Sequence, residues 1–183
     1  MTIKQYCGEV TPHKKILDSL SSNAEEALSI FQDYWKLGYD REVGRDTYLS
    51  RPTAAKDAAI GRIHLRPISF TGREKEEFGY SATEECWDKW ETDAEVPSVD
   101  SKSMHIPTSN EWIVYCVDSN RNACMLAYLP EALDPHKFCE DSDNMKTFID
   151  MADEWYSDNN SFPMDNADFP LIFSDNWLQA DGT

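Results

Sequence analysis

The strongest hydrophobic pattern lies between residues 110 and 155, where two apolar runs precede a helical repeat. The first run, Trp112 to Val117, is rich in β-branched and aromatic residues, and the second extends from Ala123 to Leu129. Residues 118–122 between them have the turn-forming sequence DSNRN. This arrangement predicts a β-hairpin with a loop of about five residues.

A helix is predicted after the hairpin, with Asp141 or Asp143 as its N-cap. Its apolar residues recur at the three-and-four spacing of a single helical face: Met145, Phe148, Ile149, Ala152, Trp155 and Tyr156. Upstream, Pro130 ends the second strand, and Pro135 favours an extended or turn conformation at the residue before it.

Two helices are predicted near the N-terminus. The first opens at Thr11-Pro12, as N-cap and first helical residue, and has the apolar side Ile16, Leu17 and Leu20. Asn23 and Glu26 resemble a capping box for the second helix, which Gly38 ends. The following residues, Gly44 to Thr47, are predicted to form a loop.

A strand is predicted over residues 61–66, because apolar and polar residues alternate there. Ile63 and Leu65 fall on one face, while Arg62, His64 and Arg66 fall on the other. Side chains on one face of a strand repeat about every 7 Å. The polar face is either a solvated outer face of an antiparallel sheet or a surface that contacts an anion.

Short motifs along the chain resemble those of the YafO family of toxins from type II toxin-antitoxin systems. They follow the family's order: Gly44-Arg45-Asp46, Arg62-Ile63-His64-Leu65, Val114-Tyr115-Cys116, Pro135-His136-Lys137, and the spacing of Asp141, Met145 and Met151-Ala152. The resemblance covers residues 29–155, apart from the segment around 71–103. It implies a RelE-like α+β fold, a small antiparallel sheet with packed helices. It also implies a ribosome-dependent mRNA interferase in the cytoplasm, whose partners are a cognate antitoxin, the ribosome and mRNA.

Cleavage of RNA without a metal requires a base, an acid and cations that stabilise the phosphorane. Histidine suits the first two roles because its pKa lies near neutrality. The catalytic candidates are therefore His64 and His136, with Arg62 and Lys137 as phosphate stabilisers. The substrate-binding candidates are Arg45, Arg66, Tyr115 and Arg121. His13 and His105 lie outside the motifs and are expected at the surface. No metal or small-molecule cofactor is expected, since the histidines and cysteines have no metal-site spacing.

The charge distribution supports an alternative function. The chain has a net charge of -17, whereas RNA-binding proteins normally present a basic surface. Acidic residues outnumber basic ones by 10 to 3 in residues 71–100 and by 10 to 1 in residues 141–183. The chain is therefore either an endoribonuclease with a locally basic groove or an acidic binding or inhibitor protein on an inactive toxin scaffold. Such a protein would mimic nucleic acid or sequester a basic partner. A third option is a soluble domain whose insert and arm mediate self-association.

The domain organisation follows from composition and charge. The 183 residues, 40% of them hydrophobic, fit one toxin-like α+β domain over residues 1–156, with an acidic insert at about 71–103 and an acidic C-terminal arm at 157–183. Trp87 and Trp90 of the insert are expected to pack on the domain. The arm is expected to dock on an apolar groove, either its own or another molecule's, and to act as a brake if it covers the RNA groove.

The cysteines and the apolar runs indicate the cell compartment. The five cysteines are odd in number and lack C-x-x-C spacing, which favours a reducing cytoplasm. Cys116 and Cys124 flank the hairpin turn symmetrically and are interpreted as two buried hydrophobes. No signal peptide or membrane span is expected, because no apolar run approaches the ~20 residues of a spanning helix.

Overall fold

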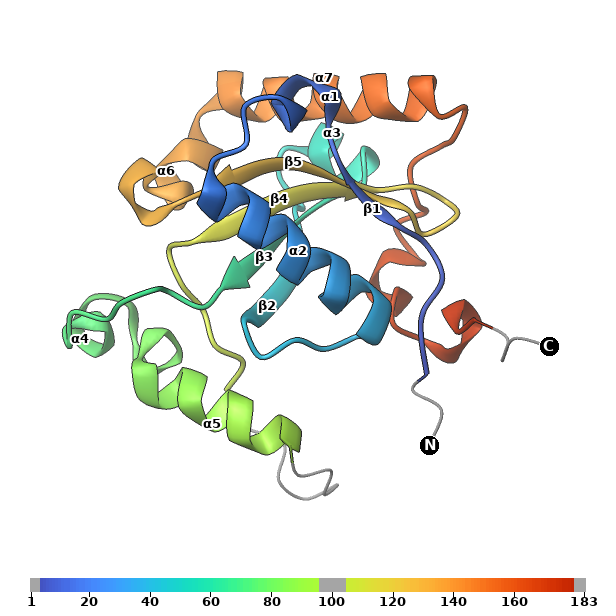
Figure 1. The fold of residues 1–183 in the computed structure, drawn as a ribbon. Helices are drawn as coiled ribbons and strands as arrows, with labels where there is room; N and C mark the ends of the chain where they lie inside the picture. Colours follow the sequence, from blue (N-terminus) through green and yellow to red (C-terminus); the bar gives the residue numbers. More distant parts are fainter. Residues whose placement is uncertain (1–3, 96–104, 180–183) are drawn as a thin grey trace.

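The fold is α+β, and the computed structural model describes residues 4–95 and 105–179. One five-stranded sheet forms its centre, in the order β1-β5-β4-β3-β2 (Figure 1). β1 pairs with β5 in parallel, and the other neighbours are antiparallel. The strands are β1 (Val10–Pro12), β2 (Val43–Tyr48), β3 (Ile60–Leu65), β4 (Trp112–Val117) and β5 (Ala123–Leu129).

Helices cover both faces of the sheet, α2 on one and α7 on the other (Figure 1). The α-helices are α1 (Lys14–Leu17), α2 (Ser22–Leu37), α3 (Thr53–Asp57), α4 (Glu74–Phe78), α5 (Glu84–Glu95), α6 (Pro135–Glu140) and α7 (Ser142–Asp158). The short 3₁₀ helices are η1 (Tyr80–Ala82), η2 (Glu131–Leu133), η3 (Phe169–Leu171) and η4 (Asp175–Trp177).

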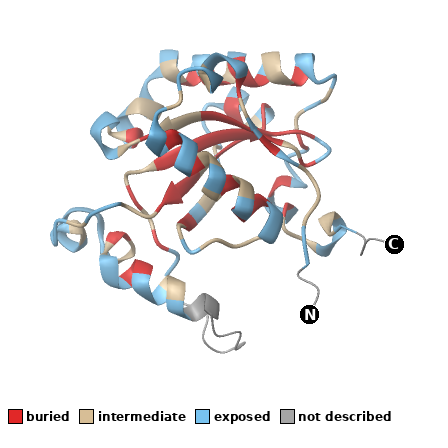
Figure 2. Ribbon diagram, in the orientation of Figure 1, coloured by how far each residue is buried: buried red, intermediate tan, exposed pale blue. Residues whose placement is uncertain are grey.

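The central hairpin has the predicted strands, and its alternate residues face two separate cores. Ile113, Tyr115 and Val117 pack against α2, whereas Trp112, Val114 and Cys116 pack against α7. Figure 2 shows that β4 is buried along its length and β5 along most of its length. Cys116 lies directly opposite Cys124, and both are buried free thiols, so their interpretation as small buried hydrophobes is confirmed.

The predicted long helices are present, with small differences at their ends. Asp141 caps α7 by accepting hydrogen bonds from the backbone N–H groups of Asp143 and Asn144. Gly38 ends α2 in the left-handed conformation, as predicted, with φ of 77°. The N-cap of α2 is Ser21 rather than Asn23, because the Ser21 hydroxyl accepts the Ala24 N–H.

Two short edge strands were not predicted. Thr11-Pro12 does not open a helix: it belongs to β1, which pairs with β5, and α1 begins after His13 caps it. Residues 44–47 are not a loop but part of β2, which pairs with β3 around a bulge. A Cβ on Gly44 would lie 2.3 Å from the Pro107 carbonyl oxygen, so glycine lets the 107 segment cross this edge.

The acidic insert packs on the domain, as expected for its tryptophans. The Trp87 side chain is fully buried and donates a hydrogen bond to the Thr108 carbonyl at 3.1 Å. Trp90 donates one to the Val43 carbonyl at 2.9 Å. These contacts attach α5 to the edge of the sheet near β2. The part of the insert at 96–103 lies outside the described residues.

The C-terminal arm docks on the protein's own core. Met164, Phe169 and Ile172 are buried in the same core as α2. Asp118 pairs with Pro163, and Tyr6 pairs with Leu178, so the arm also contacts the hairpin loop and the N-terminal segment. The expectation of an apolar docking site is therefore confirmed, and the site belongs to this chain.

Candidate functional site

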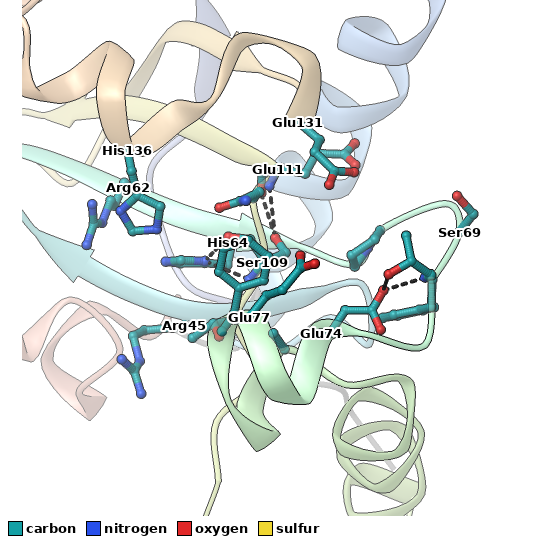
Figure 3. A pocket seen from close by; sticks show the side chains of 17 residues that line it. Arg45, Arg62, His64, Ser69, Glu74, Glu77, Ser109, Glu111, Glu131 and His136 are labelled. Atoms are coloured by element: carbon teal, nitrogen blue, oxygen red, sulfur yellow. Dashed lines mark hydrogen bonds between the residues drawn. The ribbon is translucent and has the colours of Figure 1, made fainter.

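A cavity of about 290 Å³ opens at the end of the sheet, on the α7 face, beside α6 and α4 (Figure 3). Four predicted site residues line it: Arg45, Arg62, His64 and His136. The remaining lining residues come mainly from the insert and from the segments next to β3 and β4: Pro67, Ser69, Phe70, Thr71, Glu74, Glu77, Phe78, Ala82, Thr108, Ser109, Asn110, Glu111 and Glu131. The volume is close to the lower end of small-molecule sites, roughly 300 Å³.

Trp112 organises the basic end of this cavity. It lies opposite His64 in the β3–β4 register, and their rings are 5.1 Å apart. The Arg62 guanidinium lies over the Trp112 ring at 4.2 Å, and the His136 ring meets it edge-on at 4.5 Å. Because Trp112 is fully buried, it fixes three polar side chains from β3 and α6 around one rigid surface.

The predicted alternation in β3 is confirmed, but its polar face is not solvated. Ile63 and Leu65 face the α2 core, and Arg62 and His64 lie on the opposite face beside Trp112. His64 is only 4% exposed. The Arg62 and His64 side chains therefore lie between the sheet and the cavity. Arginine and histidine side chains on the polar face of a strand are more often exposed to solvent.

The His64 ring is anchored to the backbone of Ser109. Its Nδ1 lies 2.8 Å from the Ser109 carbonyl oxygen and 2.9 Å from the Ser109 nitrogen, so either neutral tautomer finds a partner. Burial lowers the pKa of His64 to about 3, and the nearby Arg62 and Arg45 charges act in the same direction. His64 is thus neutral at physiological pH.

The two arginines of the cavity have no carboxylate partner among the described residues. Burial lowers the pKa of Arg62, and its Nε is buried without a hydrogen-bond acceptor. Arg45 extends from β2 into the solvent-exposed rim, where its side chain is visible at the same end as Arg62 and His136 (Figure 3). Two unpaired guanidinium groups beside one cavity suit an anionic ligand.

His136 stands in the first turn of α6, after Asp134 in the left-handed conformation and Pro135 at the helix start. His136 is exposed to solvent, so a ligand can reach its imidazole ring. Burial against the cavity wall and the Arg62 charge lower the pKa of His136, while Asp134 raises it. The ring is therefore mainly neutral at pH 7 and able to accept a proton.

Arg66 and Lys137 lie away from this cavity. The chain leaves β3 at Leu65, and Arg66 pairs with Asp88 of α5 at 2.6 Å. The Lys137 side chain is 82% exposed and lies 3.3 Å from Asp134. A single residue step along the helix thus turns Lys137 outward while His136 faces Trp112.

Tyr115 and Arg121 are fully buried on the α2 side of the sheet. The Tyr115 hydroxyl donates a hydrogen bond to Asp46 at 2.7 Å, and Arg121 donates to backbone carbonyls of three separate segments. Their positions do not fit the predicted contact with a substrate, because neither side chain is accessible. Both belong to the core.

The two histidines outside the motifs differ from one another. His105 is exposed, as expected, and its ring meets the Tyr80 ring edge-on, with the ring centroids 5.0 Å apart. His13 is not at the surface: it is 1% exposed, accepts the Lys15 N–H at Nδ1 and lies 3.5 Å from Glu154. Burial lowers the pKa of His13. It connects α1 to α7 and is far from the cavity lining.

Sequence reasoning missed Trp112, which packs behind the basic end of the cavity, and the lining residues Ser109, Glu74, Glu77 and Phe78. Trp112 is the first residue of β4, and this position did not indicate that Arg62, His64 and His136 would pack around its ring. The alternation in 61–66 placed Arg62 and His64 on one face of the strand, but it did not indicate that His64 would bond to Ser109, in the segment before β4. Nothing in the acidic composition of 71–78 pointed to a cavity wall.

Comparisons of the chain with protein-family models, with curated proteins and with solved structures gave no match. Within the described ranges, no three His, Cys, Asp or Glu side chains are grouped so as to hold a metal ion. In those same ranges, no helix has the length and apolar character needed to cross a lipid bilayer.

Proposed function

We propose that the protein is an RNA-cleaving toxin of the class that its motifs resemble, and that it acts at the cavity around Trp112. The main support is the convergence of Arg45, Arg62 and His136, which are separated along the chain, at one cavity end without carboxylate partners among the described residues. In this proposal the protein acts in the cytoplasm on mRNA held by the ribosome, and a cognate antitoxin controls it.

The side chains have distinct roles in the proposed reaction. His136, exposed and mainly neutral, takes the proton from the 2′-hydroxyl, whose oxygen attacks the phosphorus and forms a 2′,3′-cyclic phosphate. The bond between phosphorus and the 5′-oxygen breaks, and the leaving 5′-oxygen takes its proton from water in the open cavity. Arg62 and Arg45 stabilise the negative charge that develops on the phosphorane. His64 is neutral and fixed to Ser109, so it serves as a hydrogen-bonding group that positions the phosphate rather than as the acid.

The acidic surface of α7 lies outside the cavity lining. The exposed acids of α7 include Asp143, Asp150, Asp153 and Asp158, and neither these nor the exposed N-cap Asp141 line the cavity. Charges on the surface are screened beyond about 8 Å at physiological salt. The arm residues up to Gln179 do not line the cavity either, so the expected braking role of the arm is not supported by its position.

The test compares His136→Ala with Lys137→Ala, a matched control on the same helix turn. Each variant is expressed from a tight promoter, growth is followed, and cleavage of a defined mRNA is measured in a reconstituted translation reaction with and without ribosomes. General acid–base groups contribute about 10²–10⁴-fold, so His136→Ala is expected to lose at least about 100-fold in cleavage rate, whereas Lys137→Ala stays close to wild type. Circular dichroism and thermal unfolding confirm that both variants fold.

Undiminished cleavage by His136→Ala would contradict the proposal that His136 is the base. Absence of cleavage by the wild type, with or without ribosomes, would contradict the proposed nuclease function as a whole. The exposed acids of α7 then favour the second function, an acidic binding or inhibitor protein. In that event the wild type should bind a basic protein tightly and lose affinity steeply as salt concentration rises.

A further inference from the structure

The cavity has two chemically different ends. Arg45, Arg62 and His136 gather at one end, whereas Glu74 and Glu77 of the insert line the other (Figure 3). In this view Glu77 lies between the basic side chains and Glu74. A phosphate is attracted to the basic end and repelled by the acidic one. A nucleotide bound here is therefore oriented with its base against the insert.

Phe78 provides an aromatic surface at this acidic end. The side chain lines the cavity at the end of α4 and is 53% exposed. Exposed aromatic side chains beside a cavity are a common stacking surface for bases, worth about 1–3 kcal/mol per base in single-strand binders. The ring thus has the position and exposure that stacking requires.

Glu77, one residue earlier, has free hydrogen-bonding capacity. Its carboxylate makes one exposed ion pair, with Oε1 3.6 Å from the Arg73 Nε, and such pairs are weak. Glu74 differs, because its two oxygens accept hydrogen bonds from Thr71 and Gly72. Glu111 accepts the Tyr128 hydroxyl. Glu131 also lines the cavity, but it belongs to η2 on the wall opposite α4 (Figure 3). On the insert wall, beside Phe78, Glu77 is therefore the carboxylate best able to accept from a ligand.

We infer that the insert wall is a nucleobase subsite that selects guanine, with Phe78 stacking on the base and Glu77 accepting hydrogen bonds from its N1–H and N2–H groups. The inference deepens the proposed function and rests on it for the RNA substrate. An ionised carboxylate only accepts hydrogen bonds. Guanine presents two adjacent N–H donors on its Watson–Crick edge, whereas adenine and cytosine present an amino group and uracil a single imino group.

The same geometry gives the insert a role in the reaction. The 2′-hydroxyl is next to the 3′-phosphate, so a phosphate held at the basic end brings the 2′-hydroxyl toward His136, the proposed base, while the nucleobase extends toward Phe78. The nucleotide on the 5′ side of the cleaved bond carries both the 2′-hydroxyl and the reacting phosphate. The subsite consequently selects the base immediately before the cut.

The binding test uses nucleoside 3′-monophosphates, which resemble this nucleotide, and isothermal titration calorimetry on the full chain. Guanosine 3′-monophosphate is expected to bind at least about tenfold more tightly than uridine 3′-monophosphate, since hydrogen bonds to a charged group contribute strongly. Glu77→Gln should bring the two affinities within about threefold of each other. Phe78→Ala should weaken all four nucleotides. Glu76→Gln, an exposed neighbour on α4 outside the cavity lining, is the matched control and should keep the wild-type preference.

The outcomes separate this inference from the proposed function. Equal binding of all four nucleotides by the wild type, no binding of any, or an unchanged preference in Glu77→Gln would overturn the guanine subsite, whatever the cleavage assays show. Cleavage by the wild type together with an overturned subsite would leave the nuclease function standing. A guanine preference that depends on Glu77 without RNA cleavage would support the subsite and contradict the nuclease.

Discussion

Replacement of Arg121 tests whether a buried cation holds three parts of the chain together. The side chain is 0% exposed. Its guanidinium donates hydrogen bonds to the carbonyl oxygens of Ile172 at 2.6 Å and Trp35 at 2.8 Å, and also to that of Cys7. It also lies over the Trp35 ring at 4.5 Å. Burial lowers the pKa of Arg121 to about 10, so the group stays charged at neutral pH.

The expected destabilisation of Arg121→Met follows from these contacts. Methionine fills much of the same volume but leaves three buried carbonyls without a donor, each of which costs roughly 1–3 kcal/mol. Removing the guanidinium also removes several kcal/mol of desolvation cost, which offsets part of that loss. A net decrease of about 3 kcal/mol in the free energy of unfolding is therefore expected.

Urea denaturation followed by tryptophan fluorescence measures this change, with the midpoint compared at constant slope. Arg73→Met is the control, because the Arg73 side chain is 72% exposed and exposed substitutions usually stay within about 0.5 kcal/mol. A decrease of less than about 1 kcal/mol for Arg121→Met would refute the reasoning, since it would mean that the three carbonyls find other partners without cost.

Three further changes are predicted. Burial raises the pKa of Asp46 to about 6 in the folded protein. The protonated carboxyl group therefore stabilises the fold at pH values below the pKa of about 4 that it has in the unfolded chain. This contribution, roughly 3 kcal/mol, is lost as the pH rises from about 4 to 6. Asp46→Asn should flatten that slope in urea titrations at several pH values, and an unaltered slope would contradict the assignment. Asp141→Ala should cost about 1 kcal/mol in thermal unfolding by removing the α7 cap, and Asp143→Ala clearly less. Gly61→Ala should cost roughly 1–3 kcal/mol, because its Cβ would lie 2.7 Å from the Tyr115 ring, and wild-type stability would count against that contact.

Elements held by local patterns were predictable from sequence. The hairpin strands and α7 have their apolar periodicity and their end signals within a few residues, and they lie where predicted. β1 and β2 are different, because each is short and lies at an edge. Val10–Pro12 becomes a strand by pairing with Ala123–Met125, more than a hundred residues away, which no local pattern reveals.

The site was predictable only where one strand's alternation decided the direction of a side chain. Arg62 and His64 share a face because they are two residues apart in β3. Arg66 has the same spacing, but it comes after the strand's last residue and reaches acids on α5 instead. Tyr115 and Arg121 were candidates for substrate binding, and their burial could not be predicted because their partners, an aspartate and three carbonyls, are distant in sequence.

The pairing of the N-terminal segment with the arm also determines how the protein can be rearranged. The Gln179 N–H donates a hydrogen bond to the Gln5 carbonyl at 2.7 Å. A short linker that joins position 5 to position 179 would therefore give a circular permutant, opened beside Gly72, in which every described strand remains unbroken.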